Sequence, residues 1–274
     1  MENYSSVQDL IDMLEAGNRY HISIVFFNKY GNEKTRLRPE HVIHATPFCD
    51  AVKLMPRGLT RCLRCKQLTV ERVFRTGKAF GGLCINGVYE YCHPVKIKDE
   101  LCCILFIGNI VVDQEAFQKK NRLDSGDPLL ETMEYRMEEE DCRKIAEILD
   151  SYIRMLMAFC PATHRESGQD ATITALKGYL DYYFFQDVSL PQMARLYNYN
   201  EKYLGRLFKQ QMGISFAEYL NARRLEFCRE RLSRSNETVL DISMQAGFNN
   251  VTYFNRLFRR RYGMTPTQFR QHGG

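Results

Sequence analysis

The sequence predicts an α+β domain followed by an all-α domain, and three observations support this division. Two short strand patterns, two helical stretches and three further strand patterns follow one another in the first part of the chain. A pair of helical patterns joined by a short polar turn occurs twice in the last part. At 274 residues the chain also exceeds the usual size of one domain. We therefore expect domains at 1–163 and 171–274, joined by a polar linker at 164–170.

The first domain is expected to be a sheet with helices packed on it. The predicted elements are a capped helix at 6–16, strands at 21–27 and 34–38, helices at 48–55 and 60–75 with a stop at Gly77, and strands at 79–84, 88–97 and 101–112. This order is typical of PAS-like and GAF-like sensor modules, which hold small molecules between sheet and helices. The candidate ligand contacts are Phe26, Phe48, Tyr91, His93 and Phe106.

A segment of the last part recurs after fifty residues. The stretch from Leu204 to Gly213 matches the stretch from Phe254 to Gly263, and the register continues into the residues that follow. Each copy ends at a glycine, a frequent helix C-cap, and each follows a shorter amphipathic helix and a tight turn. Two helices joined in this way form a helix-turn-helix unit, so the sequence predicts two such units.

The second helix of each unit combines an apolar stripe with a polar outer face. The stripes expected to face the core are Leu204, Leu207 and Phe208, and Phe254, Leu257 and Phe258. The outer face fits the major groove of double-stranded DNA, where Arg bonds guanine, Asn bonds adenine and flanking cations hold phosphates. The candidate DNA contacts are Lys202, Tyr203, Arg206, Lys209, Asn250, Val251, Thr252, Tyr253, Asn255, Arg256 and Arg259.

The charge distribution agrees with a polyanionic partner for the second domain. From Asp170 onward there are 15 Lys and Arg against 9 Asp and Glu, whereas residues 1–169 hold 23 against 24. No secretion signal is present, and the longest apolar run, 101–112, is far shorter than the roughly 20 residues that cross a bilayer. We therefore expect a cytoplasmic protein without a membrane partner, with its 10 cysteines reduced.

The second unit, from Ile242 to Phe248, from Tyr253 to Phe258 and from Gly263 to Arg270, resembles the AraC/XylS family of transcription regulators. The resemblance covers residues 170–271 and implies seven helices, with a linker helix at 215–233 that places two reading helices on successive turns of DNA. A regulator of this kind is expected to act by changing its affinity for DNA or its contact with RNA polymerase. The chain departs from the family pattern at Ser243, where Ala is usual, and at Glu201-Lys202, where Ser-Pro is usual.

The first domain is similar to the PocR-type sensory domain. The motifs are Phe48-Cys49, Cys62-Leu-Arg-Cys65, Leu83 to Gly87, His93-Pro-Val95 and Gly108-Asn-Ile110. The resemblance covers residues 5–160 and implies a PAS-related domain that binds small hydrocarbon derivatives such as propanediols. Ile85 stands where that family commonly has His.

Four cysteines of this domain, Cys49, Cys62, Cys65 and Cys84, could converge on a tetrahedral zinc ion, for which His93 is an alternative ligand. The other interpretation is that they are small hydrophobic core residues.

The first domain ends with a set of mostly apolar residues at alternating spacings of three and four, namely Cys142, Ile145, Leu149, Tyr152, Leu156 and Phe159. This stripe predicts either a dimer seam, which we favour, or a helix docked on its own sensor.

Two classes of function fit these features. The first is a DNA-binding regulator, in the simplest case a homodimeric activator, controlled by a small molecule in the first domain. The second is a zinc- or thiol-based redox-sensing regulator that uses the cysteine cluster. An enzyme is not expected, because no Gly-rich phosphate loop or H-E-x-x-H motif is present and, of the six His, only His93 adjoins a cysteine, Cys92.

Overall fold

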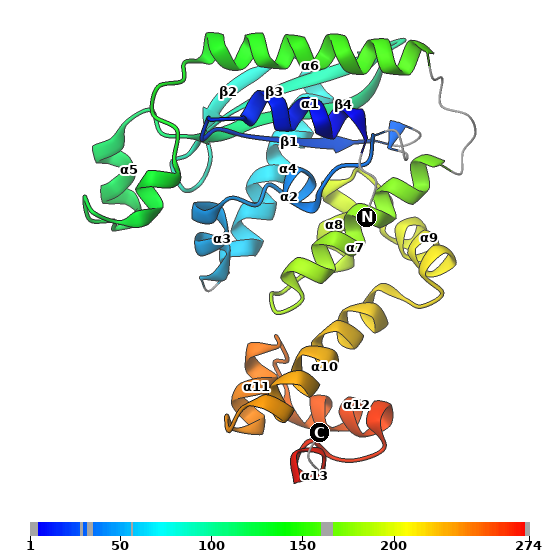
Figure 1. Cartoon of the computed structure of the whole chain (residues 1–274). Coiled ribbons are helices and arrows are strands. Elements are labelled where there is room, and N and C mark those ends of the chain that lie inside the picture. Colours follow the sequence, from blue (N-terminus) through cyan, green and yellow to red (C-terminus); the bar gives the residue numbers. More distant parts are fainter. Residues whose placement is uncertain (1–4, 28–29, 32–34, 56, 160–166, 272–274) are drawn as a thin grey trace. The chain divides into compact units, whose positions relative to one another are not determined.

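A computed structural model describes residues 5–27, 30–31, 35–55, 57–159 and 167–271 (Figure 1). The chain divides into two compact units. The first unit is Met1–Ala175 with Arg195–Tyr199, and the second unit is Leu176–Ala194 with Asn200–Gly274.

The first unit is built on a four-stranded antiparallel sheet in the order β1-β4-β3-β2 (Figure 1). Its strands are β1 (His21–Phe26), β2 (Phe80–Leu83), β3 (Tyr89–Ile97) and β4 (Glu100–Ile110). These four predicted strands are confirmed. The further strand predicted at 34–38 is wrong for residues 35–38, the part that the structure describes. The backbone of this segment forms hydrogen bonds with the start of the first helix instead. Ser5 N donates to Arg36 O at 3.0 Å, and Arg38 N donates to Gln8 Oε1 at 2.8 Å.

Two helices, α1 (Ser6–Glu15) and α6 (Glu139–Phe159), pack on one face of the sheet. The stripe predicted on α6 belongs to this core: Cys142 and Leu149 are fully buried, and Ile145, Tyr152 and Leu156 pack against the buried residues. Only the last member, Phe159, is largely exposed. The stripe therefore docks α6 on its own sheet, and our preference for a dimer seam on this face is wrong.

The helices α2 (Pro39–Ile43), α3 (Pro47–Leu54) and α4 (Gly58–Thr76) lie on the side of the sheet away from α6 (Figure 1). The predicted helices at 48–55 and 60–75 are confirmed as α3 and α4, and α4 ends at Gly77 with a φ of +60°. The sequence analysis did not predict α2, α5 (Gln114–Asn121) or the 3-10 helix η3 (Pro128–Thr132). In α5 and η3 a single apolar side chain is buried, so no apolar stripe marks these segments.

The rest of the chain is helical in the described residues. Its helices are α7 (Ser167–Tyr183), α8 (Leu190–Leu196), α9 (Glu201–Met212), α10 (Phe216–Arg234), α11 (Val239–Gln245), α12 (Val251–Tyr262) and α13 (Pro266–Gln271). The predicted linker helix at 215–233 is confirmed as α10. Of the predicted polar linker, residues 164–166 lie outside the described residues and residues 167–170 form the start of α7.

The second unit has an aromatic-rich core between α10, α11 and α12. Leu225 and Cys228 of α10 pack with Ile242 of α11 and with Phe254 and Phe258 of α12. The side chain of Arg224 on α10 donates to the carbonyls of Phe184 and Gln186, which fixes the segment after α7 to this helix. No helix among the described residues is long and apolar enough to cross a membrane.

Candidate nucleic-acid interface

The helices α9 and α12 are started and ended by the same local interactions. Asn200 and Asn250 are their N-caps, and each Asn side chain accepts a hydrogen bond from the backbone N–H three residues later, at 3.2 Å and 2.9 Å. After 12 residues each helix ends at a glycine in the left-handed region, Gly213 with φ +74° and Gly263 with φ +78°. The sequence repeat therefore corresponds to two helices of equal length with equivalent caps.

The equivalence continues beyond the glycines. Ser215 and Glu218 form a reciprocal capping box at the start of α10. Thr265 and Gln268 make the same pair of interactions at the start of α13: Thr265 N donates to Gln268 Oε1 at 3.0 Å, and Gln268 N donates to Thr265 Oγ1 at 3.3 Å. The turn after each of the two helices is thus fixed in the same way.

Burial on α9 and α12 follows the predicted stripes. All six residues predicted to face the core are buried. Of the eleven predicted DNA contacts, Val251 is partly buried against the core of the second unit, and the other ten are exposed. Two of the ten also have structural roles: Asn250 is the N-cap of α12, and the hydroxyl of Tyr253 accepts a hydrogen bond from Asn221 of α10 at 3.1 Å.

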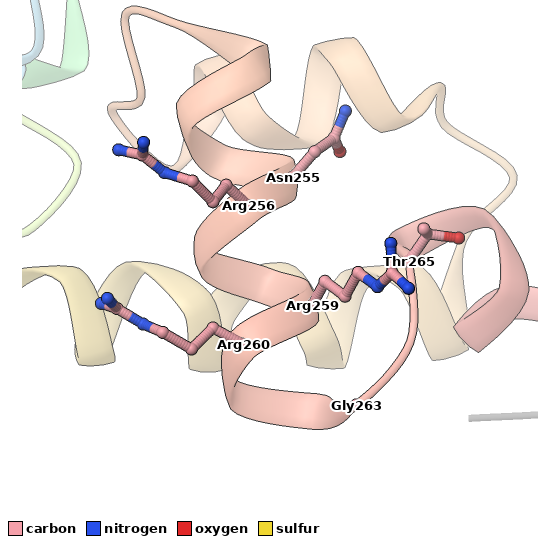
Figure 2. Close-up of a pocket in the computed structure, with 6 residues that line it drawn as sticks. All are labelled: Asn255, Arg256, Arg259, Arg260, Gly263 and Thr265. Atoms are coloured by element: carbon pink, nitrogen blue, oxygen red, sulfur yellow. The ribbon is translucent and has the colours of Figure 1, made fainter.

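A pocket of about 600 Å³ lies beside α12. Figure 2 shows Arg256 and Arg260 pointing to one side of the helix and Arg259 pointing toward Thr265. The lining residues are Asn255, Arg256, Arg259, Arg260, Gly263 and Thr265. The sequence prediction missed Arg260 and Thr265, although the run Arg259-Arg260-Arg261 was a visible basic signal.

The cations of this pocket form no salt bridge within the part of the chain that the structure describes. A carboxylate acts on them more weakly: the pKa of Glu218 is lowered mainly by hydrogen bonds from Ser215 and further by the charges of Lys209 and Arg260. The guanidinium of Arg256 instead lies 5.4 Å from the ring of Tyr253. Unpaired guanidinium groups around an open hollow form a site suited to the oxygens of phosphates and to guanine edges.

A corresponding position on α9 carries glycine. A Cβ on Gly205 would lie 3.0 Å from the side chain of Leu190 on α8, so α8 and α9 approach closely there. The equivalent position on α12 is Asn255, which is exposed. The two helices therefore present different outer faces, with Lys202, Arg206 and Lys209 as the exposed cations of α9.

The predicted ligand contacts of the first unit do not come together. Phe26 and Tyr91 belong to the core beneath α1 and α6, and His93 Nε2 lies 3.3 Å from Asp150 on α6. Phe106 is fully buried under the Nζ of Lys66, 3.1 Å from its ring centre, and Phe48 packs on Phe117 in a separate cluster. The five residues therefore lie in different parts of the first unit, and their role as ligand contacts stays a prediction.

A buried polar layer lies instead between the sheet and α2–α4. Lys66 and Glu90 form an ion pair at 2.9 Å whose side chains are each 12% exposed. His44 Nε2 lies 3.8 Å from Glu90 and forms no hydrogen bond among the described residues. Ser23, which pairs with Phe106 across β1 and β4, has a buried hydroxyl that also has no hydrogen-bond partner among them. Burial, followed by the nearby Lys66, holds the pKa of His44 well below its usual value, so this imidazole is neutral at neutral pH.

The four cysteines do not form a metal site in the described residues. No three of Cys49, Cys62, Cys65 and Cys84 bring their sulfurs within 4.8 Å of one another. Burial raises the pKa of Cys49 to about 11 and of Cys84 to about 12, and it also raises the pKa of Cys62. Since the thiolate is the metal ligand and nucleophile, these shifts favour the interpretation as core residues.

Comparison with known proteins assigns both parts of the chain. A model of a helix-turn-helix domain matches residues 193–272, which places the protein among DNA-binding regulators of the AraC type. A model described as the sensory domain found in PocR matches residues 3–160, more than half of the chain. The chain belongs to this family of sensory-domain proteins, and both resemblances seen in the sequence are confirmed.

The individual relatives are regulators and not enzymes. The regulatory protein PocR of Salmonella typhimurium is 22% identical over 91% of this chain and 88% of its own length. The HTH-type transcriptional activator RhaS of Klebsiella pneumoniae is 31% identical over 51% of each chain. Among solved structures, the C-terminal domain of AraT, a response regulator from Geobacillus stearothermophilus, is 29% identical over 37% of this chain and 84% of that chain, with a TM-score of 0.36.

Proposed function

We propose that this AraC-type regulator is a cytoplasmic, homodimeric activator that binds a specific double-stranded DNA site with two helix-turn-helix units. The observation that carries the proposal is the pair of identically capped helices, α9 and α12, each with a buried apolar stripe and an exposed cationic face. We assign DNA binding to residues 171–274, sensing to residues 1–163 and the connection to 164–170. Contact with RNA polymerase follows from the activator assignment.

The side chains of α12 divide by position into two roles. Asn255 and Arg256 are exposed at the middle of the helix, where a helix lying in the major groove faces base edges. Arg259, which points toward Thr265, and Arg260 come one turn later, where the helix leaves the groove and phosphates lie. We therefore assign base reading to Asn255 and Arg256 and phosphate binding to the later arginines, with Arg206 and Lys209 as the counterparts on α9.

The first prediction compares a base-reading residue with a phosphate-binding residue. Arg256→Ala in the full chain should weaken binding to a DNA site selected from a random library by about 1–3 kcal/mol and leave binding to unrelated DNA nearly unchanged. Lys209→Ala should weaken both equally and reduce the salt slope by about one. Titrations with the selected and a scrambled duplex at several salt concentrations measure both effects. Equal losses for Arg256→Ala on the two duplexes would contradict base reading.

We further propose that a small molecule controls the regulator through a PAS-like first unit, at the polar layer around Glu90 and Lys66. Buried polar groups are normally paired, so the unpartnered Ser23 Oγ and His44 Nε2 leave hydrogen-bonding capacity for a ligand with hydroxyl or amino groups. A ligand changes DNA binding only if it binds one arrangement of the protein more tightly than the other.

The second prediction tests this location. Short diols, amines and sugars are first screened for a compound that raises the melting temperature of the full chain. This compound should no longer raise the melting temperature of the Glu90→Gln variant, because the substitution removes the charge beside Lys66 and His44. Glu71→Gln, on the exposed side of α4, is the matched control and should keep the shift. A shift of the same size in Glu90→Gln would place the ligand elsewhere.

A further inference from the structure

Tyr253 lies in the first turn of α12 and is held by two contacts within the second unit. Its ring packs on Phe248, in the turn before the helix, with the ring centres 6.4 Å apart. Its hydroxyl accepts a hydrogen bond from Nδ2 of Asn221, on the linker helix α10, at 3.1 Å. The residue is 38% exposed, so these two contacts are what restrict the position of its ring at the surface.

The guanidinium of Arg256 lies over this ring. Its central carbon is 5.4 Å from the ring centre, within the roughly 6 Å over which an aromatic face attracts a cation. The two residues are three positions apart on α12, where side chains of one helix face are neighbours. Arg256 forms no salt bridge with the described carboxylates, so the ring is the contact that limits where its charge lies.

Holding the guanidinium in advance affects base reading more than phosphate binding. A free arginine side chain loses rotamer freedom when it bonds a base edge, and this loss lowers the affinity. A ring that already restricts the side chain reduces the loss before DNA arrives. Phosphates are bound largely by charge and are present on every sequence, so the same restriction should change binding to unrelated DNA little.

We propose that Tyr253 is a positioning residue for Arg256, and that Asn221 ties this pair to the linker helix α10. The inference rests on the proposed base reading by Arg256, and it gives Tyr253 a role through that arginine in place of a DNA contact of its own. The same two residue types stand fifty residues earlier, as Tyr203 and Arg206 of α9. The repeat therefore keeps the tyrosine and the arginine, as well as the caps, in both reading helices.

A double-mutant cycle on the full chain tests the proposal, with affinities measured for the selected and the scrambled duplex. Tyr253→Leu removes the ring and should weaken binding to the selected duplex about twofold to thirtyfold, the span between an exposed and a desolvated cation–π contact. Binding to the scrambled duplex should change little. In the Arg256→Ala background the same substitution should have no further effect, because the side chain that it positions is gone. In the Lys209→Ala background, altered on another helix, it should keep its full effect.

Two further variants test the link to α10. Tyr253→Phe keeps the ring and its packing on Phe248 but loses the hydrogen bond from Asn221, so it should weaken binding to the selected duplex less than Tyr253→Leu does. Asn221→Ala should cause a loss of the same size as Tyr253→Phe, and the two substitutions together should cause no more than either alone. A melting temperature well above the assay temperature shows that each variant is folded.

Three results would overturn the positioning role. They are an unchanged affinity of Tyr253→Leu for the selected duplex, an equal loss on both duplexes, as a phosphate contact would give, and an undiminished loss in the Arg256→Ala background, as a base contact by Tyr253 itself would give. Additive losses for Tyr253→Phe and Asn221→Ala would overturn the tie to α10. All these results leave the base reading by Arg256 intact, because Arg256→Ala alone measures it. A chain that does not distinguish the two duplexes would overturn the proposed function, and this inference with it.

Discussion

Individual side chains differ in how far their role follows from residue type. Arg256 and Arg259 of α12 were predicted from their outer positions, and their exposure and the absence of a salt bridge to a described carboxylate support that role. The cysteines and histidines behave differently. The C-x-x-C spacing suggested a zinc site that the described geometry does not form, whereas Glu15 lies beside His21 and His41 although the three are widely spaced in sequence and gave no motif. Spacing identifies side chains that share one helix but not side chains that converge from three elements.

The third prediction concerns the thiols of the first unit. Because burial raises the pKa of Cys49 to about 11 and of Cys84 to about 12, both are protonated at neutral pH, and their thiolate fraction grows only as the pH rises toward those values. In the folded chain they should therefore react with a thiol reagent at pH 7 far more slowly than in the urea-unfolded chain. Mass spectrometry of alkylated peptides measures this. Equal rates in the two states would favour the redox-sensing alternative.

At the scale of elements, local signals predicted the helices with defined ends. Asparagine and serine caps, glycine stops and apolar stripes gave α9, α10 and α12 with boundaries close to the observed ones. The segment at 35–38 shows the limit of such signals. Its residues suit a strand, but no sheet edge receives them, and their backbone groups bond to α1 instead. Pairing partners decide whether a short extended segment becomes a strand.

The fourth prediction concerns the turn between α11 and α12. Gly247 has a φ of +86°, and a Cβ there would lie 2.5 Å from the carbonyl oxygen of Phe185. Gly213 has a similar φ of +74° but open space around it. Gly213→Ala should cost about 1–2 kcal/mol for the backbone conformation alone, and Gly247→Ala should cost more because of the added contact. Urea unfolding of the second unit, followed by circular dichroism, compares them. Equal losses of unfolding free energy in the two variants would show that the backbone at Phe185 moves away from the added Cβ without a measurable penalty.

At the scale of the whole molecule, α6 carries a second apolar stripe that faces solvent. Ile148 and Met155 are each 49% exposed and Phe159 is 82% exposed, at spacings of seven and four residues along one side of the helix. The inner face of α6 is used within its own unit, so we predict that the proposed homodimer forms through this outer face.

The fifth prediction follows from that stripe. The double variant Ile148→Glu and Met155→Glu should sediment as a monomer at concentrations where the unsubstituted chain is a dimer, with its circular dichroism unchanged because both side chains are exposed. Leu68→Glu, which alters an apolar residue of α4 that is 58% exposed, is the control and should leave the mass unchanged. An unsubstituted chain that stays monomeric at every concentration measured would contradict the homodimer itself.

The sequence by itself determined the two-part organisation, the repeated helices, their caps and the exposed cations of the DNA-binding part. Each of these depends on residues within a few positions of one another, where helical periodicity and capping act. Only the tertiary structure decided that α6 docks on its own sheet, that Lys66 and Glu90 pair within the first unit, and that Glu15, His21 and His41 meet. These contacts join distant segments, and their free energy arises from burial and pairing that a linear pattern does not specify.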